Sequence, residues 1–331
     1  MDWVIFFFIF KYMKHLEDTP TFICKENDEN FITYSDTDSI YIHAKPLLQH
    51  LHKDFDSKTT KVKDNLLEQL ALKYQDLITE YYDILYKDTF NGTKFPWFDY
   101  RDKNHWLDMK TECVIRSAYF RSTRRYAQWI TKQEGIEKEN LDIKGLEFKK
   151  ANFPPILGKF FKEILIDILK GTKQNEIDIR IKDYRKKILD GSLSLLDLGN
   201  PVSVKTLNKY TLRKARAGEM FSQPAKGAPA SVKATIAYND LIRFWKLDKK
   251  HNYITQGEKV KWIYLKPNSY QVEAMAFSPS DTPDKILSFI EEYADRKKIF
   301  ESILLNKLEG LYSDMEWNLN LNPFINKFFE L

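Results

Sequence analysis

Cysteine is scarce in this sequence of 331 residues, in which Cys24 and Cys113 are the only two. Two isolated cysteines cannot build a disulfide framework, and they lack the paired spacing of a zinc site. The sequence also has no internal repeat and no low-complexity tract. These absences exclude small disulfide-rich proteins and zinc fingers, and they favour a reducing compartment, the cytoplasm.

Long apolar runs are missing as well. The run at Met1–Phe10 is too short to cross a bilayer, which takes about 20 residues. A signal peptide would begin with basic residues, whereas Asp2 comes first here. We therefore predict no membrane partner. The run is predicted to form a buried helix, whose apolar face is a place where a second chain could dock.

Neither sign of charge dominates the chain. The formal net charge is +5 and the pI is about 8.8, a mild basic bias that is compatible with nucleic-acid binding. Hydrophobic residues make up 43% and aromatic residues 15%, which argues against disorder. A chain of this length is long enough for two domains with cores of their own.

Two aspartates lie at a predicted strand-turn-strand junction. The β-branched and aromatic runs Phe31–Tyr34 and Ile40–Ile42 flank Ser35-Asp36-Thr37-Asp38-Ser39 and predict a β-hairpin. Because side chains alternate along an extended backbone, Asp36 and Asp38 are expected to point the same way. Converging carboxylates repel each other unless a cation lies between them, and hard oxygen ligands suit Mg²⁺.

An Asp-x-Asp turn alone does not identify a function. It also occurs in sugar-nucleotide transferases, in calcium loops and in solvated turns. A transferase would require a nucleotide-binding βαβ unit of about 30 or more residues before the motif. The residues that precede Asp36 are too few for such a unit and the start of the hairpin.

The surrounding motifs resemble those of family B DNA polymerases. Tyr-x-Asp-Thr-Asp-Ser followed by Ile-Tyr-Ile resembles the third polymerase motif, and the later segments are similar to the elements that follow it. These are Phe120–Ala127, similar to the Lys-Lys-Arg-Tyr-Ala element; Ile143–Glu147, similar to the palm-to-thumb passage; and Lys226–Pro229 with Ala237–Asn239, which are like the thumb of replicative polymerases from T-even-type tailed bacteriophages. Their order and rough spacing agree from about Phe31 to the C-terminus.

The resemblance implies an α+β fold. Residues 1–147 would be the C-terminal part of a polymerase palm, an antiparallel sheet with helices, and residues 148–331 a mostly helical thumb. It implies template-directed DNA synthesis from primer-template DNA and dNTP, with two Mg²⁺ ions. Asp38 would bind the ions directly, and Asp36 would assist as a ligand or by shaping the field. Glu112 is expected on the sheet near this pair, either as an auxiliary carboxylate or as a surface strand residue.

Basic residues with interleaved aromatics predict the DNA-binding surface. Arg124 and Tyr126 are expected on one face of a strand, with Arg125 on the other. By resemblance, Arg124 and Tyr126 would hold the primer terminus, although Arg124 replaces the family's usual lysine. The alternative is a solvated basic strand. Further predicted DNA contacts are Lys144, Lys214, Arg216 and Lys226.

Several motifs of the family are not in these 331 residues. The sequence lacks the first palm motif, the fingers helix with its Lys and Asn-Ser-x-Tyr-Gly, and the exonuclease carboxylates. We therefore expect activity to require a second polymerase chain that carries them. The alternative is a non-catalytic DNA-binding remnant of a truncated polymerase gene.

Hydrophobic periodicity predicts the remaining elements. We expect helices over Lys45–Lys87, from about Pro155 to a stop at Gly171, over Asn175–Leu189 and over Ile286–Leu311. Strands are expected at Leu107–Ile115, at Ser117–Ile130 and at Val260–Leu265.

The last residues are unusually apolar for a terminus. By resemblance, a short hydrophobic peptide containing Phe324, Phe328 and Phe329 would bind a sliding clamp. The alternative is a terminal segment that folds onto the core of its own domain.

Overall fold

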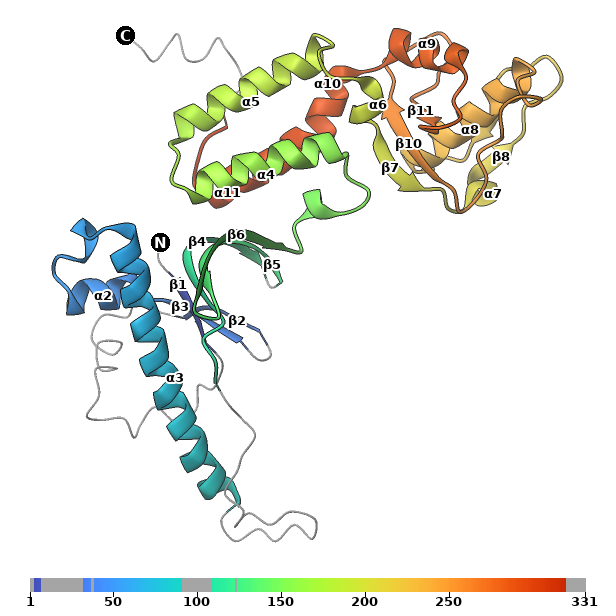
Figure 1. Ribbon diagram of the computed structural model, residues 1–331. Helices are drawn as coiled ribbons and strands as arrows, with labels where there is room; N and C mark the ends of the chain where they lie inside the picture. Colours follow the sequence, from blue (N-terminus) through green and yellow to red (C-terminus); the bar gives the residue numbers. More distant parts are fainter. Residues whose placement is uncertain (1–2, 7–31, 37–38, 91–108, 123, 320–331) are drawn as a thin grey trace, which may run out of the picture. The chain divides into compact units, whose positions relative to one another are not determined.

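The computed structural model describes residues 3–6, 32–36, 39–90, 109–122 and 124–319. The chain divides into two compact units, Met1–Leu146 and Glu147–Leu331 (Figure 1). Helices and antiparallel strands occur in both, which agrees with the predicted α+β class. The assignment of the two units as palm and thumb stays a prediction. Within the described part of the chain, no helix is both long and apolar enough to cross a membrane.

Unit 1 is built on a six-stranded antiparallel sheet in the order β2-β3-β1-β4-β5-β6. Its strands are β1 (Trp3–Phe6), β2 (Ile32–Asp36), β3 (Ser39–His43), β4 (Cys113–Ser122), β5 (Arg125–Gln133) and β6 (Ile136–Lys144). The predicted helix at Met1–Phe10 is wrong where the structure describes it, because Trp3–Phe6 is a strand paired with β3 and β4. Its β-branched and aromatic residues suit a strand.

Helices cover one face of this sheet. They are α2 (Lys45–Leu51), the short η3 (Phe55–Ser57) and α3 (Thr60–Phe90). The predicted helix over Lys45–Lys87 is therefore interrupted between α2 and α3. Phe55 causes the interruption, because its fully buried ring turns into the core beside Leu48 and Leu67.

Polar contacts fix α3 against the sheet. Lys132 of β5 donates to Asn65 at 2.8 Å and to Glu68 at 2.5 Å. Arg116 of β4 binds the Asp64 carboxylate at 3.0 Å. Lys132 is largely buried, so these partners compensate for the loss of its hydration.

The turn between β4 and β5 lies later than predicted. The sequence places a turn before Ser117, whereas β4 continues to Ser122 and the turn includes Arg124. Arg124 has a φ of 60°, a left-handed conformation that a tight hairpin turn requires. The pairing of β4 with β5 shifts register at three points, so the sheet bends.

Unit 2 begins with the two predicted helices, α4 (Pro155–Leu169) and α5 (Gln174–Leu189). Pro155 occupies the first turn of α4, where a missing N–H costs no hydrogen bond. Gly171 follows with a φ of 85°, a conformation that favours glycine and ends the helix. Phe160 of α4 stacks on Tyr184 of α5, with ring centroids 3.7 Å apart.

The rest of unit 2 carries a three-stranded sheet, β11-β10-β7, and a small β8-β9 pair. Its elements are η4 (Glu147–Lys149), α6 (Leu195–Leu198), β7 (Asn200–Ser203), α7 (Leu207–Tyr210), β8 (Thr211–Arg213), β9 (Gln223–Pro224), α8 (Ala230–Phe244), β10 (Lys259–Tyr264) and β11 (Ala274–Phe277). Helix α8 packs against β10 and β11. The predicted strand at Val260–Leu265 is confirmed as β10, with a shift of one residue.

The predicted helix over Ile286–Leu311 is broken. It comprises α9 (Asp284–Tyr293), α10 (Arg296–Ile299), the π-helical η5 (Phe300–Leu305) and α11 (Asn306–Asp314). Asp295 explains the break, because its carboxylate accepts a hydrogen bond from the Lys298 amide and caps a new helix.

Candidate metal and nucleic-acid sites

The β2–β3 hairpin carries the predicted metal ligands. Asp36 ends β2 opposite Ser39, and Tyr34 lies opposite Tyr41. Asp38 lies outside the described residues, so the convergence of the two carboxylates stays a prediction. Among the residues that the structure describes, no group of three or more His, Cys, Asp and Glu side chains could hold a metal ion.

Strand register brings Glu112 to the same end of the sheet as this hairpin turn. In β1, Val4 pairs with both Ile42 and Val114, and Phe6 pairs with Ile40. Continuing the β1–β4 register by two residues places Glu112 level with Phe6 and Ile40. Glu112 is exposed, so its carboxylate is accessible to a cation. Its auxiliary role stays a prediction.

Three aromatic rings bring two distant motifs together. Tyr41, which follows the aspartates, and Tyr126 of β5 meet through their hydroxyl groups, with Tyr41 donating to Tyr126 at 3.0 Å. Phe120 packs against both rings, with its centroid 5.2 Å from that of Tyr41 and 5.6 Å from that of Tyr126. Burial raises the pKa of the Tyr41 phenol far above its ordinary value, so this hydroxyl stays protonated.

The structure separates Arg124 from Tyr126. The prediction that both project from one strand face is wrong, because β5 begins at Arg125 and Arg124 occupies the turn. The Arg124 side chain is exposed and that of Arg125 is half-buried, whereas Tyr126 is buried. The assignment of these three residues as DNA contacts stays a prediction.

Lys144 is a further exposed cation of this region. It ends β6 opposite Tyr126, and its Nζ lies 5.6 Å from the centroid of that ring. A hydrogen bond to Tyr126 raises the pKa of the Lys144 ammonium. Lys144 is therefore positively charged at neutral pH. Burial raises the pKa of the nearby Cys113 thiol to about 12, so this residue remains a thiol at neutral pH.

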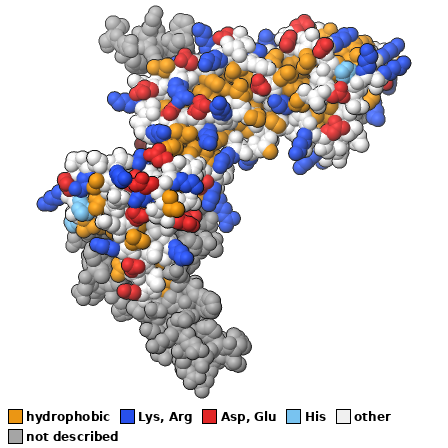
Figure 2. All heavy atoms as spheres, in the orientation of Figure 1, with side chains coloured by type: hydrophobic (Ala, Val, Ile, Leu, Met, Phe, Trp, Pro, Cys, Tyr) orange, Lys and Arg blue, Asp and Glu red, His pale blue; other side chains and the backbone are white. Residues whose placement is uncertain are grey.

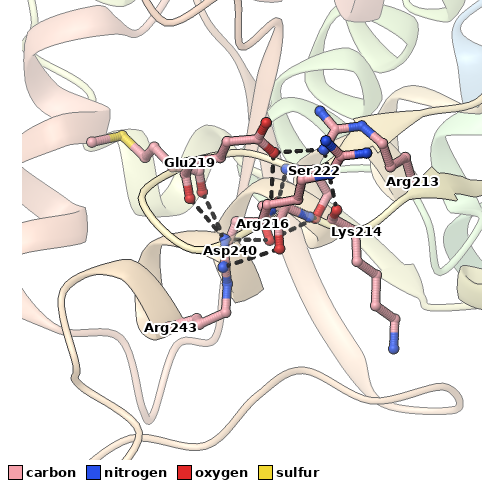
Figure 3. Close-up of polar contacts among 9 residues, drawn as sticks. Arg213, Lys214, Arg216, Glu219, Ser222, Asp240 and Arg243 are labelled. Carbon is pink, nitrogen blue, oxygen red and sulfur yellow. Dashed lines mark hydrogen bonds and ion pairs between the residues drawn. The ribbon is translucent and has the colours of Figure 1, made fainter.

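In unit 2, two predicted cations lie on a loop that joins β8 to β9. We call residues 214–222 the anchored loop, because side chains of α8 fix it in place (Figure 3). Asp240 accepts hydrogen bonds from the Ser222 amide at 2.6 Å and from the Ser222 hydroxyl at 2.8 Å. Arg243 donates to the carbonyl oxygens of Glu219 and Met220, both at 3.2 Å.

A second set of contacts closes the anchored loop on itself. Glu219 accepts from the Arg213 guanidinium at 2.6 Å and from the Arg216 amide at 2.9 Å. These donors lower the pKa of the Glu219 carboxyl, the Arg213 bond having the largest effect. The Lys214 side chain extends away from this network (Figure 3). The loop thus holds an exposed ammonium on a fixed backbone.

Lys214, Arg216 and Lys226 are all exposed. For Lys214 and Lys226, no acidic partner is found among the residues that the structure describes. Cationic side chains gather over the end of unit 2 that carries β8 and α8 (Figure 2). A surface of this kind can bind phosphate groups.

Sequence reasoning missed the residues that hold this surface. In the sequence, Asp240 and Arg243 are three residues apart, a spacing that is typical of an exposed ion pair on a helix. Only the fold shows that both reach the anchored loop, 18 to 28 residues earlier in the chain. Glu219 was an available signal, because it is the one acidic residue in the basic stretch 211–226. The predicted clamp-binding residues Phe324, Phe328 and Phe329 lie outside the described residues.

Comparison with known proteins agrees with the motif resemblance. Over 303 residues, 88% of its length, the chain is 21% identical to a DNA-directed DNA polymerase of Escherichia phage RB69. It is 20% identical over 302 residues to a DNA-directed DNA polymerase of Enterobacteria phage T4. The chain spans 31% of the length of each relative. No family model matches the sequence.

Proposed function

We propose, from this similarity to phage DNA-directed DNA polymerases, that the chain carries part of such an enzyme. Residues 1–147 would supply part of the palm, and residues 148–331 would form the thumb. The observation that carries the proposal is the contact between Tyr41 and Tyr126, since it joins the strand after the Asp pair to the Arg-Arg-Tyr element. Tyr41 and Tyr126 are 85 residues apart in the sequence. If the Asp-x-Asp segment were only a solvated turn, a buried contact between these two motifs would not be expected.

Asp36 and Asp38 are the proposed Mg²⁺ ligands, with Glu112 as an auxiliary carboxylate. Their oxygen donors fit a hard divalent cation, and the register places Glu112 at the hairpin end of the sheet. A pair of bound Mg²⁺ ions would lower the pKa of the primer 3′-hydroxyl and stabilise the departing pyrophosphate of dNTP.

The cations of both units would bind primer-template DNA. Arg124 and Arg125 would lie near the primer terminus, and Tyr126 would act by positioning them, because its ring is buried. Lys144 would contact sugar or phosphate. In unit 2, the exposed residues Lys214, Arg216 and Lys226 would follow the duplex phosphates.

The missing motifs define the remaining partners. We propose that the first palm motif, the fingers and the exonuclease act from residues outside these 331, in a second polymerase chain. Phe324, Phe328 and Phe329 would bind a sliding clamp. The chain would act in the cytoplasm of a bacterial host.

The catalytic test uses the chain with a polypeptide that supplies the missing motifs. The chain alone should incorporate no nucleotide, and the combination should extend a primer. Asp38→Asn should then lower the rate by several orders of magnitude, and Asp36→Asn by less, because metal-held charge is the main source of catalysis. Asp248→Asn, an exposed acid of unit 2, is the matched control. Extension by the chain alone, or equally mild effects of both substitutions, would contradict the proposal.

The binding test needs no second chain. Affinity for primer-template DNA should fall steeply with salt, by about 0.9 in log K per unit of log salt for each phosphate neutralised. Lys214→Ala and Lys226→Ala should each flatten that slope by about one unit, and the exposed Lys186→Ala of α5 should not. Arg124→Ala should weaken binding to a recessed primer end more than to blunt duplex. Salt-independent binding would count against a phosphate-tracking surface.

A further inference from the structure

A cleft in unit 2 is not used by the proposed duplex contacts. Its volume is about 430 Å³, within the range of about 300–1,000 Å³ that small-ligand pockets occupy. Its walls are the end of the anchored loop, helix α8 and the turn that precedes β11. Phe221, Gln223, Lys233, Tyr270 and Gln271 are among the residues that line it.

The turn that forms one wall is fixed by a single side chain. Asn268 donates to the carbonyl oxygens of Lys266 and Val272, at 2.8 and 2.7 Å. Its own amide oxygen accepts from the amides of Tyr270 and Val272, at 3.1 and 3.3 Å. Gln271 has a φ of 56°, a strained conformation that these bonds maintain. Tyr270 is therefore presented on a rigid backbone.

The opposite wall is equally fixed. It is the end of the anchored loop, where Ser222 is held by both oxygens of Asp240. Asp240 is buried, so movement of the loop away from α8 would leave its carboxylate without the two hydrogen bonds from Ser222. A buried carboxylate without such bonds is destabilising. Two rigid walls are the condition for a preformed binding site, since little conformational entropy is lost when a ligand enters.

The chemistry of the cleft suits a planar, neutral, polar ring. Tyr270 is 41% exposed, and its ring lies edge-to-face with Phe221 at 6.2 Å. The Gln223 and Gln271 amides are exposed, and each can both donate and accept. The two cations that line the cleft are already paired, Lys233 with Glu273 at 2.8 Å and Arg213 with Glu219 at 2.6 Å. The cleft therefore offers stacking and amide hydrogen bonds more than net charge.

We propose that this cleft binds an unpaired nucleobase of single-stranded DNA, stacked on Tyr270. Bases in a duplex are already stacked and paired, so only an unpaired base can enter a cleft of this kind. Lys214 lies on the loop that forms one wall, and its exposed ammonium suits a phosphate outside the cleft. This inference rests on the proposed DNA-handling function.

Fluorescence of the full chain with a short oligothymidylate that contains one 2-aminopurine tests the stacking. Binding to the chain should quench the 2-aminopurine. Tyr270→Ala should remove the quenching and weaken binding about fivefold or more, and Tyr270→Phe should retain both because the ring remains. Tyr253→Ala is the matched control, since Tyr253 is 40% exposed and does not line the cleft. Equal effects of the Tyr270→Ala and Tyr253→Ala substitutions would overturn the proposal.

A photo-cross-link tests the same site in the unaltered chain, so the result does not depend on the folding of a variant. An oligothymidylate with one 5-iodouracil should form an adduct on Tyr270 or Phe221, identified by mass spectrometry of the peptides. Adducts confined to other residues, or none, would refute the cleft.

The source of the base is tested with 2-aminopurine deoxynucleoside monophosphate alone. We expect the strand to bind more tightly than the free nucleotide, and Lys214→Ala to weaken only the strand. Equal binding of both, unchanged by Lys214→Ala, would overturn the assignment to a strand.

The two proposals fail in different ways. Salt-dependent duplex binding without Tyr270-dependent quenching would refute the cleft and leave the polymerase proposal standing. Tyr270-dependent quenching with no synthesis in the complemented reaction would support the cleft and refute the polymerase proposal.

Discussion

Replacing Asp240 with Asn should release the anchored loop while leaving the volume of the side chain nearly unchanged. The Asp240 carboxylate is buried and accepts two short hydrogen bonds from Ser222, at 2.6 and 2.8 Å. An asparagine amide has one acceptor oxygen, so its NH₂ group would face a donor from Ser222. A hydrogen bond to a charged group contributes about 1.5–3 kcal/mol. At the lower value for two bonds, we expect unit 2 to lose about 3 kcal/mol of unfolding free energy.

No further contribution is assigned to Arg243. Its guanidinium lies 3.5 Å from Asp240, but its side chain is 38% exposed, so solvent screens that pair. Arg243 would keep its bonds to the loop carbonyl oxygens of Glu219 and Met220. The loop should therefore loosen at Ser222 first.

Urea denaturation of the full chain, followed by circular dichroism, measures the loss. Asp248→Asn is the matched control, because Asp248 is an exposed acid just beyond the same helix and should change stability by less than about 0.5 kcal/mol. Ser222→Ala removes only the hydroxyl bond and should cost roughly half as much as Asp240→Asn. Hydrogen exchange should show faster exchange of the Ser222 amide. If Asp240→Asn is no more destabilising than Asp248→Asn, the anchoring argument is refuted.

Three further outcomes can be measured with single substitutions. Gly199→Ala should destabilise unit 2 by about 1–3 kcal/mol in urea, because an added Cβ would overlap with Cζ of the fully buried Phe277; no loss would show that the ring can move. Gly145→Ala should destabilise unit 1 by about 2 kcal/mol or more, since Gly145 has a φ of 64° and a Cβ would meet a backbone carbonyl oxygen; unchanged urea midpoints would contradict this. The pKa of Glu219 is lowered by Arg213, so its stabilising effect should be full above pH 4.5 and decline as the pH falls further; Glu219→Gln should lower stability at pH 7 and lose that difference in acid, and a difference that persists in acid would refute the linkage.

Local signals in the sequence were sufficient for the helices of unit 2. Pro155 and Gly171 bound α4, and its apolar stripe has helical spacing, so neighbours within one turn determine the element. The same approach failed at Trp3–Phe6. That segment is a strand because β3 and β4 pair with it, and those partners lie at least 33 residues away in the sequence. Propensity alone does not contain such partners.

In the candidate site too, the short contiguous motifs could be predicted from the sequence and the contacts between distant residues could not. The aspartate hairpin and the Arg-Arg-Tyr element were recognisable because each is a short, contiguous pattern. The contact between Tyr41 and Tyr126 was not predictable, since it depends on how the sheet bends. The shared face predicted for Arg124 and Tyr126 failed because alternation applies only inside a strand, and Arg124 lies in the turn.

The charged contacts between α3 and the sheet select one axial position for a long helix. An apolar face could slide along a sheet with little change in buried area, because leucines and alanines repeat along it. Asp64, Asn65 and Glu68 lie within about one helical turn, and they meet Arg116 and Lys132 from two different strands. A displacement of one turn, about 5.4 Å, would leave both cations without these partners, one of them largely buried. The polar contacts thus fix the register of the helix, which the hydrophobic core alone leaves undetermined.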